Sequence, residues 1–371
     1  MRRLLLIGLL LSAAPAFTDL PSEGGYAFVV LPKPSGDLMD FTIKIDLANM
    51  PASWWSNVDT SDGTKGRATT SSGTELAAAW ISFDNIGDTG QLCVLWKGTY
   101  SSSIDQTIRI YWPRSTMSSM AADATYGSDN AFDAYWAFYF PDGASNNLTS
   151  ALLPTTNFGG ISPGDSTGNF GVATNFDKVD DYVRFFPNLT ARNSVTIIAW
   201  MNADSIVSWD SLVNCRDSQQ SSLQFTSPGN IAFLWGSTDW MTPLNVPISL
   251  NTWHFVAGSV GPTFHETRVD STVNNEATSQ GTLAWNTIDI GYDKHLPDST
   301  RYFDGRIQEV QGHTTTRSSV WLDREYLQTN NNAADFGTWS FNAPISGFIN
   351  ISILQYKINA SFNKYFNTRF N

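Results

Sequence analysis

Five short apolar strings between Asn175 and Asp335 constrain the fold of this chain more than any single residue does. Each has the length of a strand, is rich in β-branched and aromatic residues, and is separated from the next by Gly, Pro, Asn, Asp and Ser. In order along the chain they are residues 175–183, 195–200, 253–257, 288–292 and 302–310. The series predicts a two-sheet jelly roll, and it does not by itself identify a ligand.

Composition limits the class of protein. The chain has 371 residues, of which 15% are charged and 13% are aromatic, so it can build two sizeable hydrophobic cores. The net charge of −12 argues against a protein that wraps nucleic acid, because phosphate contacts need a basic face. We therefore expect an all-β chain of two domains without a nucleic-acid partner.

The N-terminus has the pattern of a secretory signal peptide. Arg2 and Arg3 precede an apolar run at residues 4–11, and Ala14-Pro15-Ala16 supplies small residues for cleavage after Ala16. The run is shorter than the ~20 residues that span a bilayer, and no later segment is long and apolar enough to do so. A buried strand and a membrane anchor are the alternatives. We expect residues 1–16 to be removed and the protein to be secreted, extracellular or at the cell surface.

The two cysteines, Cys93 and Cys215, fall in different expected domains. A disulfide between them would have to join domains, or each could join another chain, and two buried thiols acting as small hydrophobes are the simpler reading. The histidines show no paired spacing of the zinc type.

The first expected domain, residues 27–113, is a smaller β-sandwich. Residues 41–47 alternate strictly between apolar and polar, which places Phe41, Ile43, Ile45 and Leu47 on one face of a strand, and this face should be core. A second alternating string lies at residues 107–112.

This domain resembles an uncharacterised bacterial domain of secreted proteins that commonly precedes laminin-G-like domains. The resemblance rests on Asp46-Leu47, Met50-Pro51, Trp55-Ser56-Asn57 and the Gly73–Leu76 segment, over roughly eighty residues. Residues 65–70 depart from the family by their lack of large apolar side chains, so the strand there should be short, frayed or at an edge. The family's function is unknown.

Four tryptophans of this domain are candidates for sugar stacking, because an aromatic ring packs well on the apolar face of a pyranose. Burial in the core is the commoner fate of such residues. On a strand, the adjacent Trp54 and Trp55 would point to opposite sides, so one of them could line a ligand surface. The other two are Trp80 and Trp96.

The second expected domain, residues 130–340, resembles the laminin-G-like and concanavalin-A-like lectin/glucanase superfamily. The resemblance spans about two hundred residues and rests on six strings in the family's order: 176–183, 196–200, 253–257, 290–291, 303–310 and a closing helical turn at 321–327. It implies a jelly roll that serves lectins, enzymes and scaffolds alike. Residues 114–129 would be a linker.

Three residues depart from the family pattern in turns and at the rim. Lys178 stands where the family has Gly, so the left-handed turn should be remodelled. Ser271 replaces another turn Gly, and Gln308 replaces an Asp. Each change should weaken a turn or a carboxylate contact, whereas none alters a core position.

Catalysis is not expected. The glucanases of the superfamily carry paired Glu residues on one strand, about 5 Å apart, and no such spacing occurs in this chain. Glu309 is the only Glu in a family-like strand, and a lone strand carboxylate is more often a salt-bridge partner than an acid catalyst.

Calcium is the expected ion, if any. Members of the superfamily hold Ca²⁺ at the rim of the sandwich with Asp carboxylates and backbone carbonyls. Asp177, Asp180 and Asp181 cluster in one loop, and Asp289 or Asp293 could join them. The alternative is that these residues cap turns and face solvent.

These observations favour a secreted, non-catalytic protein that binds polysaccharide or glycoprotein glycans, or mediates adhesion. Trp54, Trp55, Trp240 and Tyr292 are the expected sugar-contacting residues. The basic, Asn-rich tail at 344–371 could add an edge strand or allow self-association. The alternative functions are a structural subunit of a surface fibre or virion decoration, and a polysaccharide hydrolase.

Overall fold

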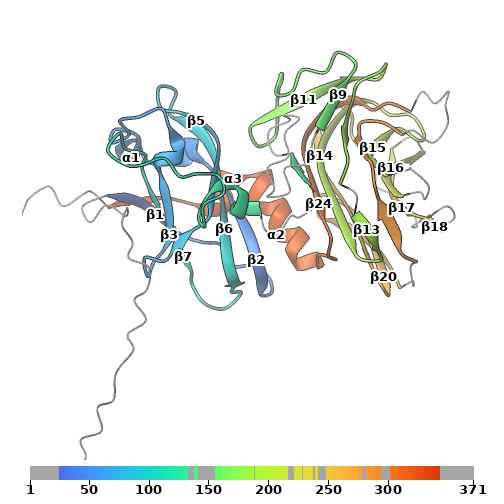
Figure 1. The fold of residues 1–371 in the computed structure, drawn as a ribbon. Coiled ribbons are helices and arrows are strands. Elements are labelled where there is room, and N and C mark those ends of the chain that lie inside the picture. Colours follow the sequence, from blue (N-terminus) through green and yellow to red (C-terminus); the bar gives the residue numbers. More distant parts are fainter. Residues whose placement is uncertain are drawn as a thin grey trace, which may run out of the picture.

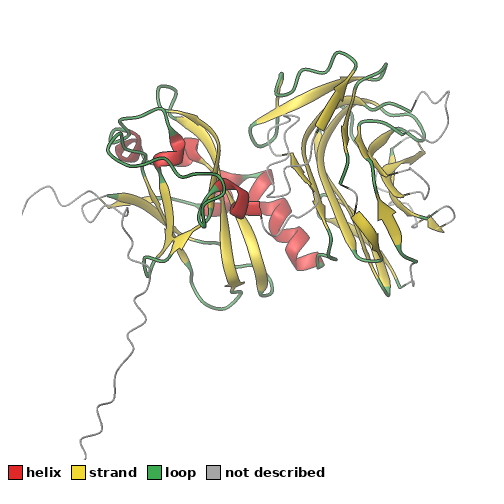
Figure 2. Cartoon of the chain, viewed as in Figure 1, coloured by secondary structure: helices red, strands yellow, loops and turns green. Residues whose placement is uncertain are grey.

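The computed structural model describes residues 25–132, 138–140, 155–187, 189–215, 221–227, 229–236, 239–240, 248–277, 281–293 and 301–342. Strands dominate the described chain, and they form two β-sandwiches with a helix between them (Figure 1, Figure 2). The expectation of an all-β chain with a smaller N-terminal sandwich and a concanavalin-A-like jelly roll is confirmed.

The first sandwich packs two antiparallel sheets. Sheet A has the order β25-β1-β7-β3-β4, with β1 at Tyr26–Val30, β3 at Arg67–Thr70, β4 at Glu75–Leu76, β7 at Thr107–Tyr111 and β25 at Ser340–Asn342. Sheet B has the order β2-β6-β5, with β2 at Leu38–Asp46, β5 at Ala78–Asp84 and β6 at Thr89–Tyr100. Short helical turns connect them: η1 Leu47–Asn49, α1 Ala52–Trp55, η2 Gly63–Lys65 and η3 Ser128–Phe132.

The alternating string at residues 41–47 forms β2 and its continuation, and its apolar side chains are fully buried between the sheets, as expected (Phe41, Ile43, Ile45, Leu47). The polar-rich segment at residues 65–70 gives the short strand β3. This strand does not lie at an edge, because β7 pairs with it on one side and β4 on the other.

The second sandwich also packs two sheets. Sheet C has the order β10-β11-β24-β14-β19-β20-β21, with β10 Ser166–Thr167, β11 Val172–Asp177, β14 Val195–Ser205, β19 Trp253–Gly261, β20 Phe264–Val269, β21 Thr272–Glu276 and β24 Asp304–His313, and β8 Phe138–Phe140 also pairs with β24. Sheet D has the order β18-β17-β16-β15-β23-β12-β9, with β9 Thr155–Phe158, β12 Tyr182–Phe185, β15 Ser211–Cys215, β16 Ser221–Ser227, β17 Asn230–Trp235, β18 Asp239–Trp240 and β23 Ile288–Ile290. A separate pair joins β13 Leu189–Arg192 to β22 Leu283–Trp285.

Sheet C is apolar on both faces at its centre. Ile197 and Ala199 of β14 belong to the core between sheets C and D, whereas Ile198 and Trp200 belong to the core cluster of the first sandwich. Successive residues of a strand point to opposite faces, so β14 serves two cores at once. A strand that is buried on both faces needs apolar side chains at successive positions, which explains why residues 195–200 are almost all apolar.

The chain returns to the first sandwich after the jelly roll. Helix α2 (Ser319–Asn330) contacts β2 of sheet B and β19 of sheet C, and it lies between the two sandwiches in Figure 1. Helix α3 (Asn332–Phe336) also contacts β2, and β25 then pairs with β1. The domain limits at 113 and 340 remain predictions. They assign residues 319–340 to the jelly roll, whereas the structure packs residues 319–342 on the first sandwich as well.

Two side-chain amides of this returning segment cover the outer edge of β2. Gln328 accepts a hydrogen bond from the Lys44 backbone N–H at 3.1 Å and donates to the Thr42 carbonyl at 3.1 Å. Asn332 donates to the Lys44 carbonyl at 2.7 Å and accepts from the Asp46 N–H at 3.0 Å. These amides occupy the positions where another strand would otherwise pair.

The segment expected to be a linker, residues 114–129, is bound to the first sandwich along its length. Arg67 donates to the Ser118 carbonyl at 2.8 Å, and the Met120 N–H donates to the Thr64 carbonyl at 3.0 Å. The Ala78 N–H donates to the Tyr126 carbonyl at 3.1 Å. This segment therefore packs as part of the first sandwich, because its backbone carbonyls and N–H groups form hydrogen bonds with residues of that sandwich.

Two expected sugar-contacting residues lie in the core instead. Trp54 and Trp55 are on the one-turn helix α1, not on a strand, and their relative exposures are 0% and 6%. Each indole N–H donates to a backbone carbonyl, of Ile110 and Leu47 respectively. Their rings are enclosed by the sandwich, so neither presents a face to a ligand.

Cys93 and Cys215 are both buried thiols, in the first and the second core respectively, so no disulfide joins the domains. The expected signal peptide at 1–16 and the tail at 344–371 lie outside the described residues. Among the described residues, no helix has the length and apolarity needed to cross a membrane.

Candidate functional site

The loop that joins β11 to β12 carries the three clustered aspartates. Lys178 lies within it at φ +62°, so the left-handed turn of the family is kept and not remodelled as expected. A non-glycine residue in this conformation costs about 1–2 kcal/mol. The Lys178 ammonium donates to Ser205 Oγ at 2.9 Å and lies 3.2 Å from Asp210 Oδ2, and these contacts offset the cost.

Asp177, Asp180 and Asp181 each place a carboxylate oxygen within 4.8 Å of the others. Asp181 is buried, and it accepts hydrogen bonds from the N–H groups of Gly160 at 2.8 Å and Asp177 at 3.1 Å. Burial, followed by the charges of Asp177 and Asp180, raises the pKa of Asp181. Three carboxylates so close together repel one another, and a divalent cation would relieve that repulsion.

Asp177 also caps the turn, since its Oδ1 accepts from the Val179 N–H at 2.8 Å and from the Asp180 N–H at 3.4 Å. The capping role that the sequence left open is therefore present. Asp177 caps with Oδ1 alone, whereas both oxygens of Asp181 accept backbone N–H groups.

A row of four half-buried rings lies beside this loop. We call Phe158, Tyr182, Tyr292 and Tyr302 the aromatic row. Phe158 stacks on Tyr182 with ring centroids 4.2 Å apart, Tyr182 meets Tyr292 at 5.0 Å, and Tyr292 stacks on Tyr302 at 4.4 Å. The rings come from β9, β12 and the bridged residues at 292 and 302, which the sheet brings together although they lie far apart in sequence.

The aromatic row and the aspartate loop form one site, which we call the rim site. Burial raises the pKa of Tyr302 to about 12, and the neighbouring Tyr292, Tyr182 and Asp180 add to that rise. Asp181 directly precedes Tyr182 in the chain, so the aspartate loop runs into the aromatic row. Arg184 adds a cation over the rings of Phe158 at 5.4 Å and Tyr182 at 5.1 Å.

Gly291 sets the course of the chain into the aromatic row. Its φ is +83°, and a Cβ atom there would lie 2.5 Å from the Phe176 ring. Its N–H donates to the Leu212 carbonyl at 2.9 Å, and its carbonyl accepts from the Phe303 N–H at 2.9 Å. Only Gly fits this position, which gives the Ile-Gly string at 290–291 a physical reason.

Sequence reasoning missed an exposed tryptophan near the row. Trp209 is 37% exposed and has φ +79°, a strained conformation for a bulky residue. The Arg301 guanidinium lies 5.5 Å from its ring centroid and also pairs with Asp293 at 2.8 Å. Backbone strain of this kind is concentrated at functional sites, but no local sequence pattern predicts it.

Of the expected site residues, Tyr292 lies in the aromatic row beside Tyr182, and the three aspartates lie together in the loop that precedes Tyr182. Asp289 and Asp293 do not join the aspartate cluster, because Arg184 holds the first at 2.6 Å and Arg301 holds the second. Trp240 lies in β18, paired with Leu234, and its side chain is outside the described part of the chain.

The other two departures from the family pattern lie in or beside hydrogen-bonded segments. Gln308 is buried and accepts from the N–H groups of Asn169 at 2.6 Å and Phe170 at 2.9 Å, so its amide fixes that loop. Beside Ser271, Asp270 takes the left-handed conformation at φ +52° and accepts from the Phe255 N–H at 2.9 Å.

Glu309 is not available to a substrate. It is 1% exposed on the face of sheet C that α2 covers, and it forms ion pairs and hydrogen bonds with Lys44 and Gln311. Its role as a salt-bridge partner is the one the sequence favoured.

The second sandwich is similar in sequence to a known superfamily. The model of the concanavalin A-like lectin/glucanases superfamily matches residues 177–322. Domain 4 of the GH43 extracellular arabinanase AbnA from Geobacillus stearothermophilus, solved with arabinotriose, is 16% identical, with a TM-score of 0.43 over 51% of this chain and 97% of that one. The binding domain of Paraclostridial Mosquitocidal Protein 1 is 11% identical, with a TM-score of 0.42 over 52% of each chain. None of the curated proteins matches the sequence.

Proposed function

We propose, from the concanavalin A-like domain at residues 177–322 and the rim site built on it, that this chain is a secreted, non-catalytic glycan-binding or adhesion protein. Its partners are polysaccharide or glycoprotein glycans at a cell, matrix or particle surface. The single observation that carries the proposal is the aromatic row beside the aspartate loop.

The chemistry of the rim site suits a sugar. Half-exposed rings pack on the C–H face of a pyranose, while carboxylates and guanidinium groups accept from and donate to its hydroxyls. Tyr182, Tyr292 and Tyr302 supply rings with hydroxyl groups, and Asp180 and Arg184 supply the charged partners. Rigid side chains held by a sheet also lose little conformational entropy when a ligand binds.

Calcium is the second part of the proposal. Asp177, Asp180 and Asp181 would supply carboxylate oxygens, which are the ligands that Ca²⁺ prefers. Burial raises the pKa of Asp181, and the charges of Asp177 and Asp180 add to the rise; a cation bound here would neutralise these charges. The ion would order the loop next to the aromatic row.

The non-catalytic part rests on the position of Glu309. The glucanases of the superfamily use paired Glu carboxyl groups on one strand, about 5 Å apart at the scissile bond. The one Glu in a family-like strand is enclosed by α2 and paired with Lys44, so it cannot reach a polysaccharide.

Binding of the full secreted chain to an array of glycans tests the proposal. We expect selective binding to one class of glycan, and we expect Tyr182→Ala and Tyr302→Ala each to weaken it at least about tenfold, as for the loss of a stacking ring. Phe186→Ala is the matched control, since this ring is 42% exposed on the same domain and lies outside the aromatic row. Equal binding by all four proteins would contradict the proposal.

A further inference from the structure

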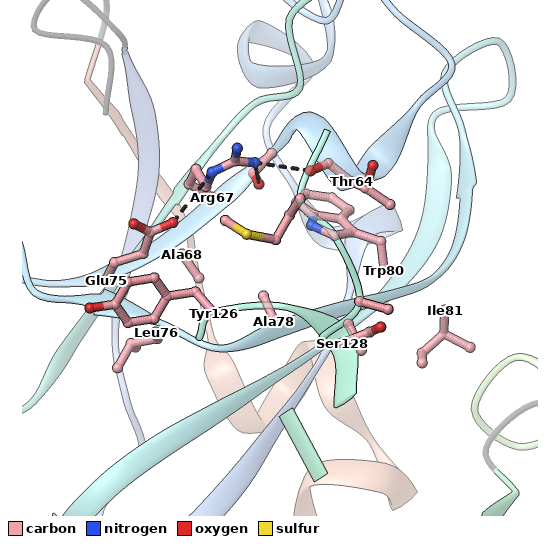
Figure 3. Close-up of a pocket in the computed structure, with 14 residues that line it drawn as sticks. Thr64, Arg67, Ala68, Glu75, Leu76, Ala78, Trp80, Ile81, Tyr126 and Ser128 are labelled. Carbon is pink, nitrogen blue, oxygen red and sulfur yellow. Dashed lines mark hydrogen bonds and ion pairs between the residues drawn. The ribbon is translucent and has the colours of Figure 1, made fainter. Parts of the chain in front are cut away.

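The first domain contains two neighbouring cavities between the edges of its sheets. The first has a volume of about 290 Å³ and is lined by β3, β5 and the 114–130 segment (Figure 3). The second measures about 440 Å³. Glu75, Leu76 and Tyr126 line both, so the two cavities adjoin at these residues. We call the combined space the sheet-edge groove.

The groove is built before any ligand arrives. Arg67 is 4% exposed, and its guanidinium donates to the carbonyls of Thr64 at 2.9 Å, Gly66 at 2.8 Å and Ser118 at 2.8 Å. One side chain thus joins the η2 turn to the segment that forms the opposite wall. Preorganised walls of this kind reduce the cost of binding.

The lining combines rings with a polar pair. In Figure 3 the Tyr126 ring and the Trp80 indole stand on either side of Ala78, and both rings are half-buried. Arg67 Nε lies 3.3 Å from Glu75 Oε1. Three small residues line the same cavity, and we call them the alanine floor (Ala68, Ala78, Ala79).

Charge and backbone pairing narrow the class of ligand. In the first cavity the charges of Arg67 and Glu75 cancel, which favours a neutral ligand over an anion. A peptide strand would add by pairing with the backbone, and at the junction of β4 and β5 two backbone groups are already paired: the Ala77 carbonyl accepts from the Leu95 N–H at 2.9 Å, and the Ala78 N–H donates to the Tyr126 carbonyl at 3.1 Å. A ligand that is read by rings and side-chain polar atoms fits the groove better.

We propose that the sheet-edge groove is a second binding site, specific for a short neutral oligosaccharide. One sugar ring would lie over the alanine floor between Trp80 and Tyr126, and Glu75, which faces both cavities, would accept hydroxyl hydrogens from that ring and from the next. The site deepens the glycan-binding function proposed for the rim site, and it makes the chain bivalent. Two modest affinities on one chain combine into much tighter attachment to a polymer that can reach both sites.

The test uses the full chain carrying Tyr182→Ala and Tyr302→Ala, so that the rim site is silent. Neutral glucan, xylan and arabinan oligosaccharides, a sialylated oligosaccharide and trilysine are titrated by calorimetry and by saturation-transfer NMR. We expect a neutral oligosaccharide to bind. In that background Tyr126→Ala and Glu75→Gln should each weaken its binding at least about tenfold.

Two further variants keep the result clear. Ala122→Trp adds a ring at an exposed position on the lip of the first cavity and should block binding without removing any native contact. Tyr26→Ala removes a half-buried tyrosine that lines neither cavity, and it should bind as the background protein does.

The outcomes separate the two proposals. Loss of all oligosaccharide binding in the rim-silent chain, with full binding by groove variants that keep the rim, overturns the groove site and leaves the rim proposal standing. Binding that survives in the rim-silent chain and disappears with Tyr126→Ala, Glu75→Gln and Ala122→Trp supports the groove. Binding of trilysine or of the sialylated probe in its place overturns the neutral-sugar assignment.

Discussion

Lys44 of the first sandwich and Glu309 of the jelly roll form an ion pair that is sealed from solvent, with side-chain exposures of 0% and 1%. Glu325 of α2 pairs with the same ammonium, and Gln311 donates to both carboxylates. Glu309 Oε2 has no hydrogen-bond partner in the described part of the chain. Two carboxylates therefore share one cation where the two sandwiches and the helix meet.

This cluster should make stability depend on pH. Burial raises the pKa of Glu309 to about 7, and Glu325 adds to the rise while Lys44 opposes it. Because the folded pKa lies above the unfolded value of 4.5, the contribution is fully present below about pH 4.5 and is lost as the pH rises through 7. Urea unfolding from pH 5 to pH 8 should show that Glu309→Gln gains stability relative to the parent, by up to about 3 kcal/mol at the alkaline end. A difference independent of pH would contradict this.

Lys44→Met tests the same cluster from the other side. Removal of the cation leaves two buried carboxylates facing each other, which typically costs about 3–5 kcal/mol. The loss of unfolding free energy should be larger at pH 8 than at pH 5, where the carboxyl groups take up protons. The double variant with Glu309→Gln should recover part of the loss, and a lack of recovery would show that Lys44 acts mainly through packing.

Gly291→Ala should destabilise the jelly roll by about 2–5 kcal/mol, the sum of a left-handed backbone and an overpacked Phe176. Gly236→Ala is the matched control, since Gly236 has a similar φ of +82° but no atom within 4 Å of the added Cβ. It should cost only about 1–2 kcal/mol. Thermal unfolding of the two variants measures the difference, and equal losses would mean that the contact with Phe176 is unimportant.

Calcium should raise the melting temperature of the protein, since an ion that binds only the folded state stabilises it by mass action. EDTA should reverse the shift. Asp180→Asn should abolish it while changing the metal-free stability little, because Asp180 is exposed and its carboxylate belongs to the aspartate cluster. A melting temperature that is the same with EDTA and with millimolar Ca²⁺ would sink the calcium proposal.

Lys178→Gly and Lys178→Ala should differ in a defined direction. Both remove the ion pair with the buried Asp210, whose pKa is raised by burial. Only Gly relieves the left-handed backbone, so it should be more stable than Ala by about 1 kcal/mol. Chemical denaturation of the two proteins gives this difference, and an Ala variant as stable as the Gly variant would argue against strain at this turn.

The sequence predicted most of what periodicity encodes. Phe41, Ile43 and Ile45 alternate because one face of β2 is core, and the strings at 195–200 and 253–257 form adjacent strands of sheet C. The aspartate cluster was found because its members lie within five positions of each other. Patterns of this kind involve residues close together in the chain, so they can be recognised in the sequence alone.

The remaining features depend on contacts between distant segments. Trp54 and Trp55 were predicted to contact a ligand, but they are buried. An aromatic residue in a sequence can pack in a core or against a sugar, and its hydrophobicity does not distinguish the two. The aromatic row brings together residues as far apart in the sequence as 158 and 302, so no local sequence pattern could reveal it. Pairing of β25 with β1 joins residues more than three hundred positions apart, and nothing local in Ser340–Asn342 indicates that partner.

The pairing of β25 with β1 also bears on how the protein is made. A ribosome releases the first sandwich long before it releases residues 319–342, which carry α2, α3 and the strand that flanks β1. Until then, the edges of β1 and β2 and the apolar surface under Trp321 stay uncovered, and exposed edges of this kind invite pairing with other chains. Translation of residues 319–342 is thus the step that covers these edges of the first sandwich, and a stop codon before them would leave an aggregation-prone product instead of a shorter working protein.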